Sequence, residues 1–412
     1  MADFRVLHVV QTPLDFVGGP ATYVRELSRY LAEYGVEVGI VSPSPLKYTE
    51  EMEALNNNYG VKTYYVNLKV FRSLLRAPWV FSVRAHKLIS RIVKYYDVVN
   101  VHVESTLLQQ LTGTFNSARL VSTVHGIYPY EDIEVIKHDP LNIYRIFRLM
   151  FISPQHYITL KNLVSNSECV VPVAGFLAKK IRAMFDVKEE KLVVIPNSVD
   201  TDFFKPIKRD LALKVVNDFL RRKGFIQISE SAEVILFLSR IDPRKGLHIL
   251  LRSLKNLNYK PWILLVAGTG QPSYISHVME LASKLNLAEK VCFVGRVPKP
   301  LLPYFYSVAS VYVLPSMFEG LPTTILEAMA CGTPVVASGV SGIPEVIVNN
   351  QNGLIINSLS EDLLCRTINL ILSDLSLKKE LSKEAIKTVK EKFSWEINIQ
   401  KYLRLFNELS NQ

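Results

Sequence analysis

Short apolar, β-rich runs alternate with longer segments of helical period along almost the whole of this 412-residue chain. Runs of this kind that end in Gly, Ser, Pro or a charged residue are typical of buried parallel strands, with a helix connecting each strand to the next. The pattern therefore predicts an α/β protein with two doubly wound parallel sheets. The expected strands lie at residues 4–10, 36–42, 98–103 and 118–126 in the first half, and at 233–241, 262–268, 290–295, 311–316 and 334–338 in the second.

The chain is long enough for two domains, because a single hydrophobic core stops growing beyond about 250–300 residues. A boundary is expected within residues 192–206, where an apolar strand gives way to proline, asparagine and aspartate residues. This predicts Rossmann-like domains at residues 1–205 and 206–390. After Asn349 the pattern is helical to the end, and an amphipathic helix in residues 391–412 is expected to pack back on the N-terminal domain.

Composition limits the class of protein. A chain with 49% hydrophobic and 21% charged residues is expected to fold throughout. Its four cysteines lie far apart, which predicts neither a zinc site nor a disulfide framework and fits a reducing cytosol. The N-terminus lacks the features of a signal peptide, and no apolar run approaches the roughly 20 residues that cross a bilayer. We therefore expect a cytoplasmic protein, and the net charge of +10 favours an anionic partner.

Part of this positive charge is concentrated in residues 68–96, which contain no acidic residue. From Pro78 on, an apolar and a basic stripe follow helical spacing. A basic amphipathic helix could lie on anionic lipid as a peripheral membrane contact, or it could pack on the sheet with its cations in water. The apolar stripe is Phe81, Ala85, Leu88, Ile89 and Ile92, and the basic residues of the segment are Lys69, Arg72, Arg76, Arg84, Lys87, Arg91 and Lys94.

Two loops after expected strands have the composition of anion sites, and open parallel sheets bind ligands beyond the carboxyl ends of their strands. Gly18 and Gly19 precede a helix, where backbone N–H groups can approach an anion, although a tight turn without ligand has the same sequence. Arg240 ends a strand, and Lys245 with Gly246 opens a helix. Two cations at a helix start suit a diphosphate, and the alternative is a capped helix with solvated cations.

The most specific motif is FEGLPTTILEAMACGTPVVAS, in which Glu319 follows a strand and Glu327 lies in the next helix. Carboxylates accept hydrogen bonds from vicinal hydroxyls, which sugars and ribose supply. Two acidic residues on one loop and helix therefore indicate a nucleotide-sugar site. Without the Gly-Leu-Pro context, a charge at a helix N-terminus and a surface glutamate would be the favoured explanation.

Glu319 and Glu327 resemble the E-x7-E signature of the retaining glycosyltransferases of family four, which have the GT-B fold of two Rossmann-like domains facing across a cleft. The resemblance extends to the glycine pair, to VHG at residues 124–126 and to Arg240 with Lys245. It covers almost the whole chain.

The family resemblance implies a role for each matching residue. Arg240 and Lys245 bind the donor diphosphate, and the loop of Gly18 and Gly19 closes over the phosphates. Glu327 holds the ribose hydroxyls.

The transferred sugar and the nucleobase have their own expected contacts. Glu319 holds hydroxyls of the sugar, and His125 reaches the sugar from the opposite domain, whereas His102 is expected to be a core or loop residue. The other implied contacts are the backbone of Gly320, Leu321 and Pro322 for the sugar and the loop of Gly295, Arg296 and Val297 for the base.

By the same resemblance, the reaction is transfer of a hexose-type sugar from a UDP- or GDP-linked donor to a glycan or lipid-linked acceptor, without metal or cofactor and with front-face attack. A nucleotide-sugar epimerase or hydrolase and a catalytically silent binding module remain alternatives. A NAD-dependent dehydrogenase is disfavoured because the GxGxxG fingerprint is missing. Nucleic acid is not expected as a partner, since no recognised module is present.

Overall fold

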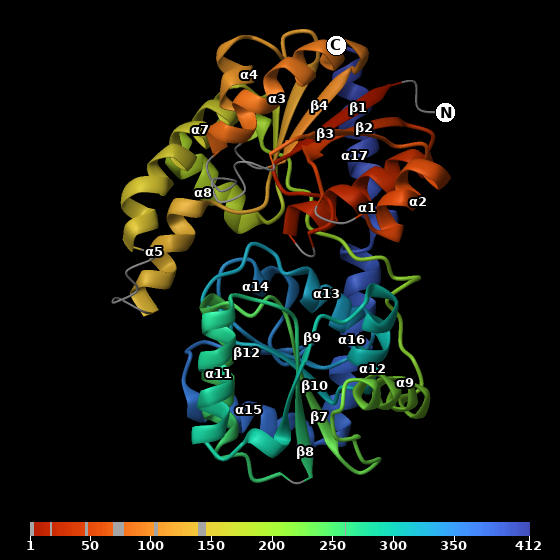
Figure 1. The fold of residues 1–412 in the computed structure, drawn as a ribbon, viewed down its shortest axis with the longest axis vertical. Helices are drawn as coiled ribbons and strands as arrows, with labels where there is room; N and C mark the ends of the chain where they lie inside the picture. Colours follow the sequence, from red (N-terminus) through yellow and green to blue (C-terminus); the bar gives the residue numbers. More distant parts are fainter. Residues whose placement is uncertain are drawn as a thin grey trace. The chain divides into compact units, whose positions relative to one another are not determined.

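In a computed structural model, the chain divides into two compact units (Figure 1): unit 1 is Met1–Asn197 with Glu396–Gln412, and unit 2 is Ser198–Trp395. The division comes earlier than the predicted boundary at residue 205. Val199, near the start of unit 2, donates its N–H at 2.9 Å to the carbonyl of Phe393, the residue that follows the last helix of that unit. The structure describes residues 4–16, 19–45, 48–68, 78–102, 106–138, 146–259 and 261–412.

Unit 1 contains a six-stranded parallel sheet in the order β3-β2-β1-β4-β5-β6. The order reverses between β1 and β4, which places the switch point of the sheet at the carboxyl ends of these strands. The strands are β1 (Arg5–Val10), β2 (Glu37–Pro43), β3 (Lys62–Val66), β4 (Val98–His102), β5 (Arg119–Val124) and β6 (Cys169–Pro172). The helices are α1 (Gly19–Glu33), α2 (Glu50–Tyr59), α3 (Pro78–Ile92), η2 (Val93–Tyr95), α4 (Leu107–Leu111), α5 (Tyr128–His138), η3 (Arg148–Ile152), α7 (Ser153–Asn166), α8 (Gly175–Phe185), η4 (Glu189–Lys191) and α17 (Trp395–Ser410).

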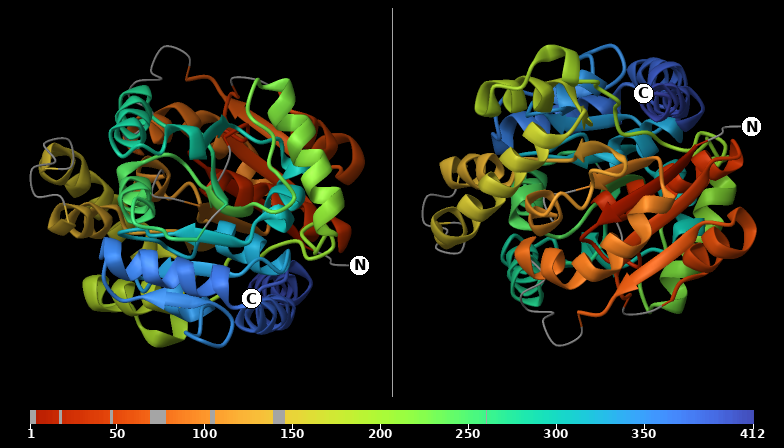
Figure 2. Two further views of the ribbon diagram at one scale, coloured as in Figure 1. Left: turned by 90° about the horizontal axis from the view of Figure 1, so that it is seen from below. Right: turned by 90° about the horizontal axis from the view of Figure 1, so that it is seen from above.

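Helices cover both faces of this sheet (Figure 2), so the strand residues are buried on both sides. Leu7 and Val9 of β1 pack with Phe81 of α3 in one buried cluster, so α3 covers one face. Alternate strand residues point to the other face. There Tyr23 of α1 packs on the ring of His102 in β4.

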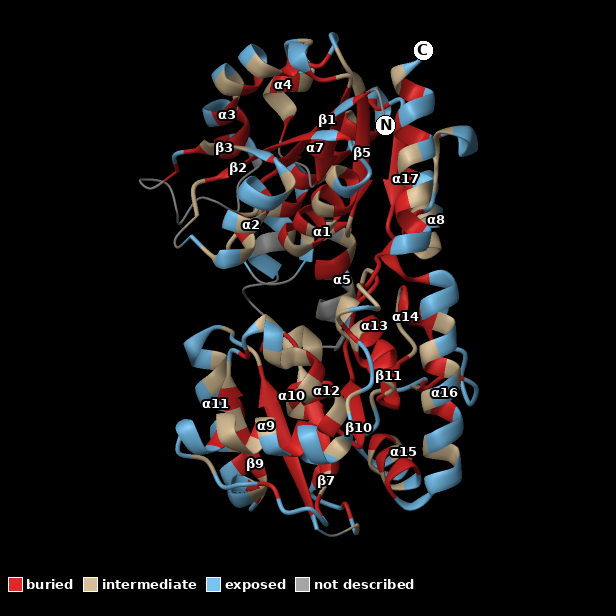
Figure 3. Cartoon of the chain, turned by 90° about the vertical axis from the view of Figure 1, so that its right-hand side faces the viewer, coloured by how far each residue is buried: buried red, intermediate tan, exposed pale blue. Residues whose placement is uncertain are grey.

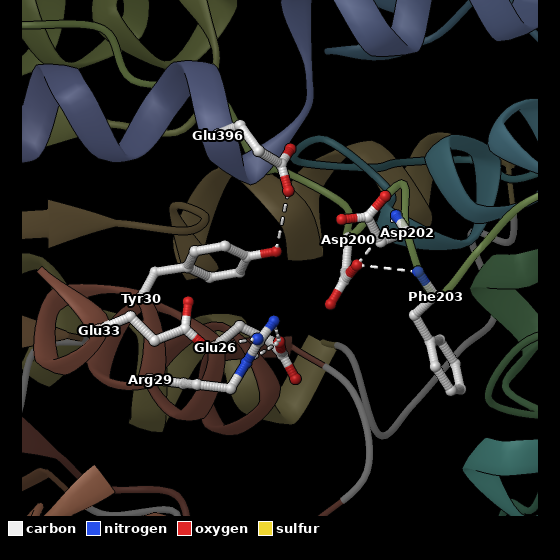
Figure 4. Close-up of polar contacts among 8 residues, drawn as sticks. All are labelled: Glu26, Arg29, Tyr30, Glu33, Asp200, Asp202, Phe203 and Glu396. Atoms are coloured by element: carbon white, nitrogen blue, oxygen red, sulfur yellow. Dashed lines mark hydrogen bonds and ion pairs between the residues drawn. The ribbon is translucent and has the colours of Figure 1, made fainter.

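The last helix, α17, belongs to unit 1 and packs along α1. Tyr402 and Tyr23 share a hydrogen bond of 2.6 Å between their hydroxyls, and Tyr30 donates to Glu396 at 3.2 Å (Figure 4). Of the apolar residues that make the pattern of this helix amphipathic, Tyr402 and Phe406 are buried, whereas Ile397 is 36% exposed.

Helix α3 packs its apolar stripe on the sheet. Of the two alternatives predicted for this segment, insertion of the apolar stripe into lipid is therefore wrong and packing on the sheet is found. Phe81, Ala85 and Ile89 are buried in the core, and Leu88 and Ile92 are partly buried against it, so this stripe cannot enter a bilayer. None of the helices in the described ranges is long and apolar enough to cross a membrane. Lys69, Arg72 and Arg76 lie outside the described residues, and the exposed face of α3 and η2 carries Trp79, Val83, Arg84, Lys87, Arg91, Lys94 and Tyr95.

Unit 2 repeats the topology with a parallel sheet in the order β12-β11-β10-β7-β8-β9. Its strands are buried and its helices expose their outer faces (Figure 3). The strands are β7 (Glu233–Leu238), β8 (Trp262–Ala267), β9 (Val291–Gly295), β10 (Val311–Leu314), β11 (Val335–Ser338) and β12 (Leu354–Ile356). The helices are α9 (Arg209–Arg222), η5 (Pro243–Lys245), α10 (Leu247–Leu254), α11 (Pro272–Lys284), η6 (Ala288–Lys290), η7 (Lys299–Leu301), α12 (Leu302–Val308), α13 (Thr323–Ala330), α14 (Ile343–Val346), α15 (Glu361–Ser373) and α16 (Leu375–Lys392).

The predicted α/β class and the doubly wound sheets are confirmed, with three strands missed and one misplaced. The three missed strands, β3, β6 and β12, are short and lie at the edges of the two sheets. A prediction based on long apolar runs does not find such strands. The prediction of helix throughout after Asn349 is therefore wrong at β12. The apolar run expected as a strand at 192–195 forms only an isolated bridge, between Leu192 and Val170 of β6.

Candidate functional site

The order of strands in unit 2 reverses between β10 and β7, so the switch point lies at the carboxyl ends of these two strands. The loop after β7 contains Arg240 and Lys245, and the loop after β10 contains Glu319. The two loops are joined by a backbone hydrogen bond of 2.8 Å from the N–H of Met317 to the carbonyl of Arg244. The fold thus brings two motifs that are far apart in sequence to one edge of the sheet.

A sharp turn places Lys245 at this edge. Asp242 accepts the N–H of Arg244 at 3.0 Å and starts the one-turn helix η5, and Gly246 then adopts a left-handed conformation with φ of 73° before α10. A Cβ at Gly246 would overlap the backbone carbonyl oxygen of Pro315 in the loop after β10. Glycine is needed here for both its backbone conformation and this close approach.

Lys245 and Glu319 form a buried ion pair. The ammonium Nζ donates to both carboxylate oxygens, at 2.6 and 2.8 Å, and the two side chains are 12% and 7% exposed. Ser316 donates its hydroxyl to Oε1 of Glu319 at 2.6 Å. Burial lowers the pKa of Lys245, and the nearby Arg244 and Arg240 lower it further, whereas Glu319 opposes this shift. Arg240 itself is exposed.

Glu327 lies on α13, in the helix that follows the Glu319 loop. Its Oε2 accepts a hydrogen bond of 2.6 Å from the hydroxyl of Tyr306, a residue of α12 that is fully buried. Tyr312 donates its hydroxyl to the carbonyl of Leu238 at the end of β7 and approaches Thr324 at 2.8 Å. These two tyrosines fix the start of α13, and with it Glu327, against the switch point.

The other predicted residues of unit 2 lie at the same edge without forming part of this cluster. Leu321 is buried, and Pro322 caps α13. Arg296 and Val297 follow β9, which is two strands from β7, and only Arg296 is exposed. This loop follows a strand at the carboxyl edge, as the sequence predicts, and Gly295 is the last residue of β9.

The predicted site residues of unit 1 are Gly18, Gly19 and His125. Gly18 lies outside the described residues, and Gly19 opens α1 with φ of 59° and open space where a Cβ would point. His125 follows β5 and lies with its Nε2 3.2 Å from Nδ1 of His102. Nε2 of His102 lies 3.0 Å from Nδ1 of His8 in β1.

Two family descriptions match the chain. Glycosyltransferase Family 4 matches residues 17–203, and Glycosyl transferases group 1 matches residues 219–388. The chain belongs to glycosyltransferase family four. The prediction drawn from the paired glutamates is confirmed at the level of family and fold.

Two relatives of this glycosyltransferase are themselves named as glycosyltransferases. A D-inositol 3-phosphate glycosyltransferase of Kribbella flavida is 26% identical over 94% of this chain and 90% of its own length. An uncharacterized glycosyltransferase of Methanocaldococcus jannaschii is 32% identical, but the match spans 56% of this chain and only 57% of that protein.

Solved structures share the fold of this glycosyltransferase over nearly its full length. Sucrose-phosphate synthase of Thermosynechococcus elongatus superposes with a TM-score of 0.79 at 21% identity, covering 98% of this chain and 99% of that one. The Anabaena protein HepE, solved in complex with UDP and glucose, gives a TM-score of 0.76 at 17% identity over 98% of this chain and 100% of that one. These likenesses establish the GT-B fold.

Sequence reasoning gave no site role to four residues of the glycosyltransferase that lie in these contacts. Ser316 and Tyr306 donate hydrogen bonds to the two glutamates, and no local pattern reports a contact between residues 306 and 327. His102 lies against His125, and His8 lies against His102; here the sequence carries a signal. Each sits near the carboxyl end of a strand, and such ends meet at one edge of a parallel sheet. Within the described residues, no group of three or more His, Cys, Asp or Glu side chains is arranged to hold a metal ion.

The histidine chain should make the glycosyltransferase sensitive to acid. Burial lowers the pKa of His8 and of His125 to about 3, and burial together with the neighbouring imidazoles lowers that of His102. Unfolded histidines take up a proton below about pH 6.5, so the unfolded state binds more protons than the folded state between about pH 6.5 and 3. The free energy of unfolding should fall as pH is lowered through this window, by about 1.4 kcal/mol per pH unit for each histidine.

Denaturant unfolding at several pH values checks this expectation. The substitution His8→Phe should make the fall with decreasing pH shallower by about 1.4 kcal/mol per pH unit. His277→Phe is the matched control, because His277 is exposed on α11 and should leave the slope unchanged. Equal slopes for His8→Phe and the parent chain would contradict the account.

Proposed function

We propose that this protein transfers a hexose-type sugar from a UDP- or GDP-linked donor to a glycan or lipid-linked acceptor with retention of anomeric configuration. The observation that carries the proposal is the cluster of Lys245, Glu319 and Ser316 at the switch point of unit 2, with Glu327 on the adjoining helix. A GDP-mannose-dependent phosphatidylinositol monomannoside mannosyltransferase of Mycolicibacterium smegmatis, 28% identical over 52% of this chain and 56% of its own length, supports a lipid-linked acceptor.

In this proposal Arg240 and Lys245 bind the donor diphosphate. The ammonium of Lys245 has three N–H donors, so it can keep Glu319 and still donate to a phosphate oxygen. A diphosphate has more negatively charged oxygens than a single carboxylate, so it can accept hydrogen bonds from both cations. The loop that begins α1, with Gly18 and Gly19, is proposed to close over the phosphates.

Glu319 is proposed to hold hydroxyls of the transferred sugar. Its Oε1 accepts from both Lys245 and Ser316, whereas Oε2 accepts from Lys245. Because a carboxylate oxygen has two lone pairs, Oε2 retains the capacity to accept a sugar hydroxyl. The backbone of Gly320, Leu321 and Pro322 would supply further contacts to the sugar.

Glu327 is proposed to hold the ribose hydroxyls, with Tyr306 keeping its carboxylate in place. Arg296 and Val297 would lie against the nucleobase, and His125 of unit 1 would contact the transferred sugar. These roles follow the family pattern.

The chemistry requires stabilisation of the charge that builds on the β-phosphate as the sugar departs. Arg240 and Lys245 are proposed to supply this, because a cation held beside the phosphate stabilises its developing charge, and the proposed reaction then needs no metal or cofactor. Glu319 is proposed to orient the sugar and not to act as a nucleophile, because its carboxylate already accepts hydrogen bonds from Lys245 and Ser316. We therefore propose front-face attack by the acceptor, whose proton passes to the departing phosphate.

Donor binding and product analysis test this proposal together. Saturating UDP- or GDP-sugar at about 100 times Kd should stabilise the fold by about 2.7 kcal/mol, seen as a rise in Tm. The product formed with an acceptor should retain the anomeric configuration in NMR spectra. A donor that binds but yields free sugar or an epimer without any acceptor would contradict transferase activity, as would inversion of the anomeric centre.

We further propose that the protein works in the cytoplasm and docks peripherally on anionic membranes through the exposed face of α3 and η2. The four exposed cations at Arg84, Lys87, Arg91 and Lys94 lie beside exposed Trp79, and a cation near an anionic surface contributes about 1 kcal/mol to binding. The contact is therefore electrostatic and interfacial, since the apolar stripe of α3 is occupied by the core.

Co-sedimentation with vesicles tests the membrane proposal. The double substitution Lys87→Glu with Arg91→Glu should reduce binding to anionic vesicles at low salt by about tenfold or more. Lys379→Glu with Lys383→Glu makes the same change of charge on α16 and should leave binding unchanged. Absence of binding to anionic vesicles by the parent chain at low salt would overturn the proposal.

A further inference from the structure

His8, His102 and His125 form a hydrogen-bonded chain through unit 1. Each comes from or directly follows a different strand of the sheet: β1, β4 and β5. The contacts are head to tail, with Nδ1 of His8 3.0 Å from Nε2 of His102, and Nδ1 of His102 3.2 Å from Nε2 of His125. His8 and His102 are fully buried, and His125 is partly exposed.

The chain has only two consistent proton arrangements at neutral pH. Burial lowers the pKa of His8 and of His125 to about 3, and lowers that of His102 as well, so each ring is neutral and carries one N–H. Either every proton sits on Nδ1 and the donors point from His8 toward His125, or every proton sits on Nε2 and they point the opposite way.

The two ends of the chain decide between these arrangements. Nε2 of His8 is buried and has no hydrogen-bond partner among the described residues, whereas His125, at the other end of the chain of rings, is partly exposed. Protons on Nε2 would bury an N–H donor of His8 without an acceptor, which proteins rarely tolerate. Protons on Nδ1 leave only a lone pair unsatisfied at that end and place an N–H at the accessible end.

We propose that His8 and His102 are positioning residues that hold His125 in its Nδ1–H tautomer, so that His125 presents an outward N–H donor to an oxygen of the bound substrate. This rests on the proposed function, in which His125 contacts the transferred sugar. His125 then donates a hydrogen bond and does not remove the acceptor's proton, because its only basic nitrogen accepts from His102.

The surroundings of His125 support a positioning role for the chain. The ring of Tyr23 packs edge-on against His125, with centroids 4.8 Å apart and planes at 75°, and Tyr23 is itself held by Tyr402 at 2.6 Å. The imidazole of His125 is therefore constrained in orientation by Tyr23 and in tautomer by His102.

NMR of the full chain with ¹⁵N-labelled histidine tests the proposal without any substrate. The ring nitrogens should show His8, His102 and His125 as neutral Nδ1–H tautomers at pH 7. Exposed His277 should show the Nε2–H form that predominates in water. A proton on Nε2 of His125, or a doubly protonated ring at any of the three positions, would overturn the proposal.

Two substitutions at His102 separate positioning from packing. His102→Phe should lower kcat by about tenfold or more with a smaller change in KM, and should move the proton of His125 toward Nε2. In His102→Asn the amide NH₂ stands close to the original Nδ1–H, so it should recover most of the lost kcat and the tautomer of His125. Equal loss in both variants, with both folded, would contradict the proposal.

The NMR result is independent of the proposed function. If the three Nδ1–H tautomers are present but no donor sugar is transferred, the proposed function fails and the histidine chain stands. If transfer occurs and His125 carries its proton on Nε2, the positioning proposal fails and the transferase proposal stands. If His102→Phe does not fold, the spectrum of the parent chain alone decides.

Discussion

Replacing Lys245 with alanine should lower kcat/KM for sugar transfer by about a hundredfold or more, as expected when a preorganised charge at a developing negative centre is removed. Lys245 is the buried cation of the switch-point loop, and its Nζ holds both oxygens of Glu319. Steady-state kinetics with varied donor would measure the effect. Lys255→Ala, at the exposed end of α10, is the control and should transfer normally.

Loss of activity in this variant must be separated from loss of stability. Removing one partner of a buried ion pair leaves the other charge uncompensated and costs about 3–5 kcal/mol. The double substitution Lys245→Met with Glu319→Gln removes both charges, so it should recover much of the stability. It should not recover transfer, because neither the phosphate cation nor the sugar-binding carboxylate is present. A stable double variant with normal kcat/KM would contradict the assignment.

Replacing Glu327 with alanine should weaken donor binding by at least about tenfold, or about 1.4 kcal/mol. Its carboxylate would accept hydrogen bonds from two ribose hydroxyls, and hydrogen bonds to a charged group contribute about 1.5–3 kcal/mol. Isothermal titration with the nucleoside diphosphate measures the loss directly, since the ribose is present and the sugar is absent. Exposed Glu380 on α16 supplies the control, Glu380→Ala.

Tyr306→Phe sharpens the test of Glu327. This change removes only the hydroxyl that donates to Oε2 at 2.6 Å, so the carboxylate stays but loses its orientation. We expect a loss of about 1 kcal/mol in donor binding, smaller than that of Glu327→Ala, and little further loss when the two changes are combined. Fully additive losses, or normal binding in Glu327→Ala, would contradict the role given to this pair.

The sequence predicts the fold well because its central strands are long, apolar and bounded by turn residues. It predicts the loops of the site because parallel strands present their carboxyl ends at one edge, which placed Arg240, Lys245 and Glu319 correctly after β7 and β10. It cannot predict the short edge strands, since Leu354–Ile356 carries too few apolar residues to stand out from a buried helix segment.

Contacts between distant side chains are the part that sequence reasoning could not supply. The ion pair between Lys245 and Glu319 joins residues 74 positions apart, and the contact of His8 with His102 spans 94. Motif reasoning gave each of Lys245 and Glu319 its own ligand. The structure adds an ion pair between the two side chains, so the cation proposed to bind phosphate contacts the carboxylate proposed to bind the sugar.

The strand order supports the proposed place of the donor site in unit 2. The strand order reverses between β10 and β7, where Glu319 and Lys245 meet. A reversal of this kind leaves room for a ligand between the two neighbouring loops. Unit 1 has its own switch point at β1 and β4, which is where α1 begins after Gly18 and where the histidine chain runs.

A crystal structure of the protein soaked with UDP-glucose or GDP-mannose would show whether the loops after β7 and β10 bind the donor. We expect the diphosphate within hydrogen-bonding distance of Nζ of Lys245 and the ribose hydroxyls on the carboxylate of Glu327. A donor bound at another surface, or one bound here with Lys245 and Glu327 turned away from it, would contradict the account.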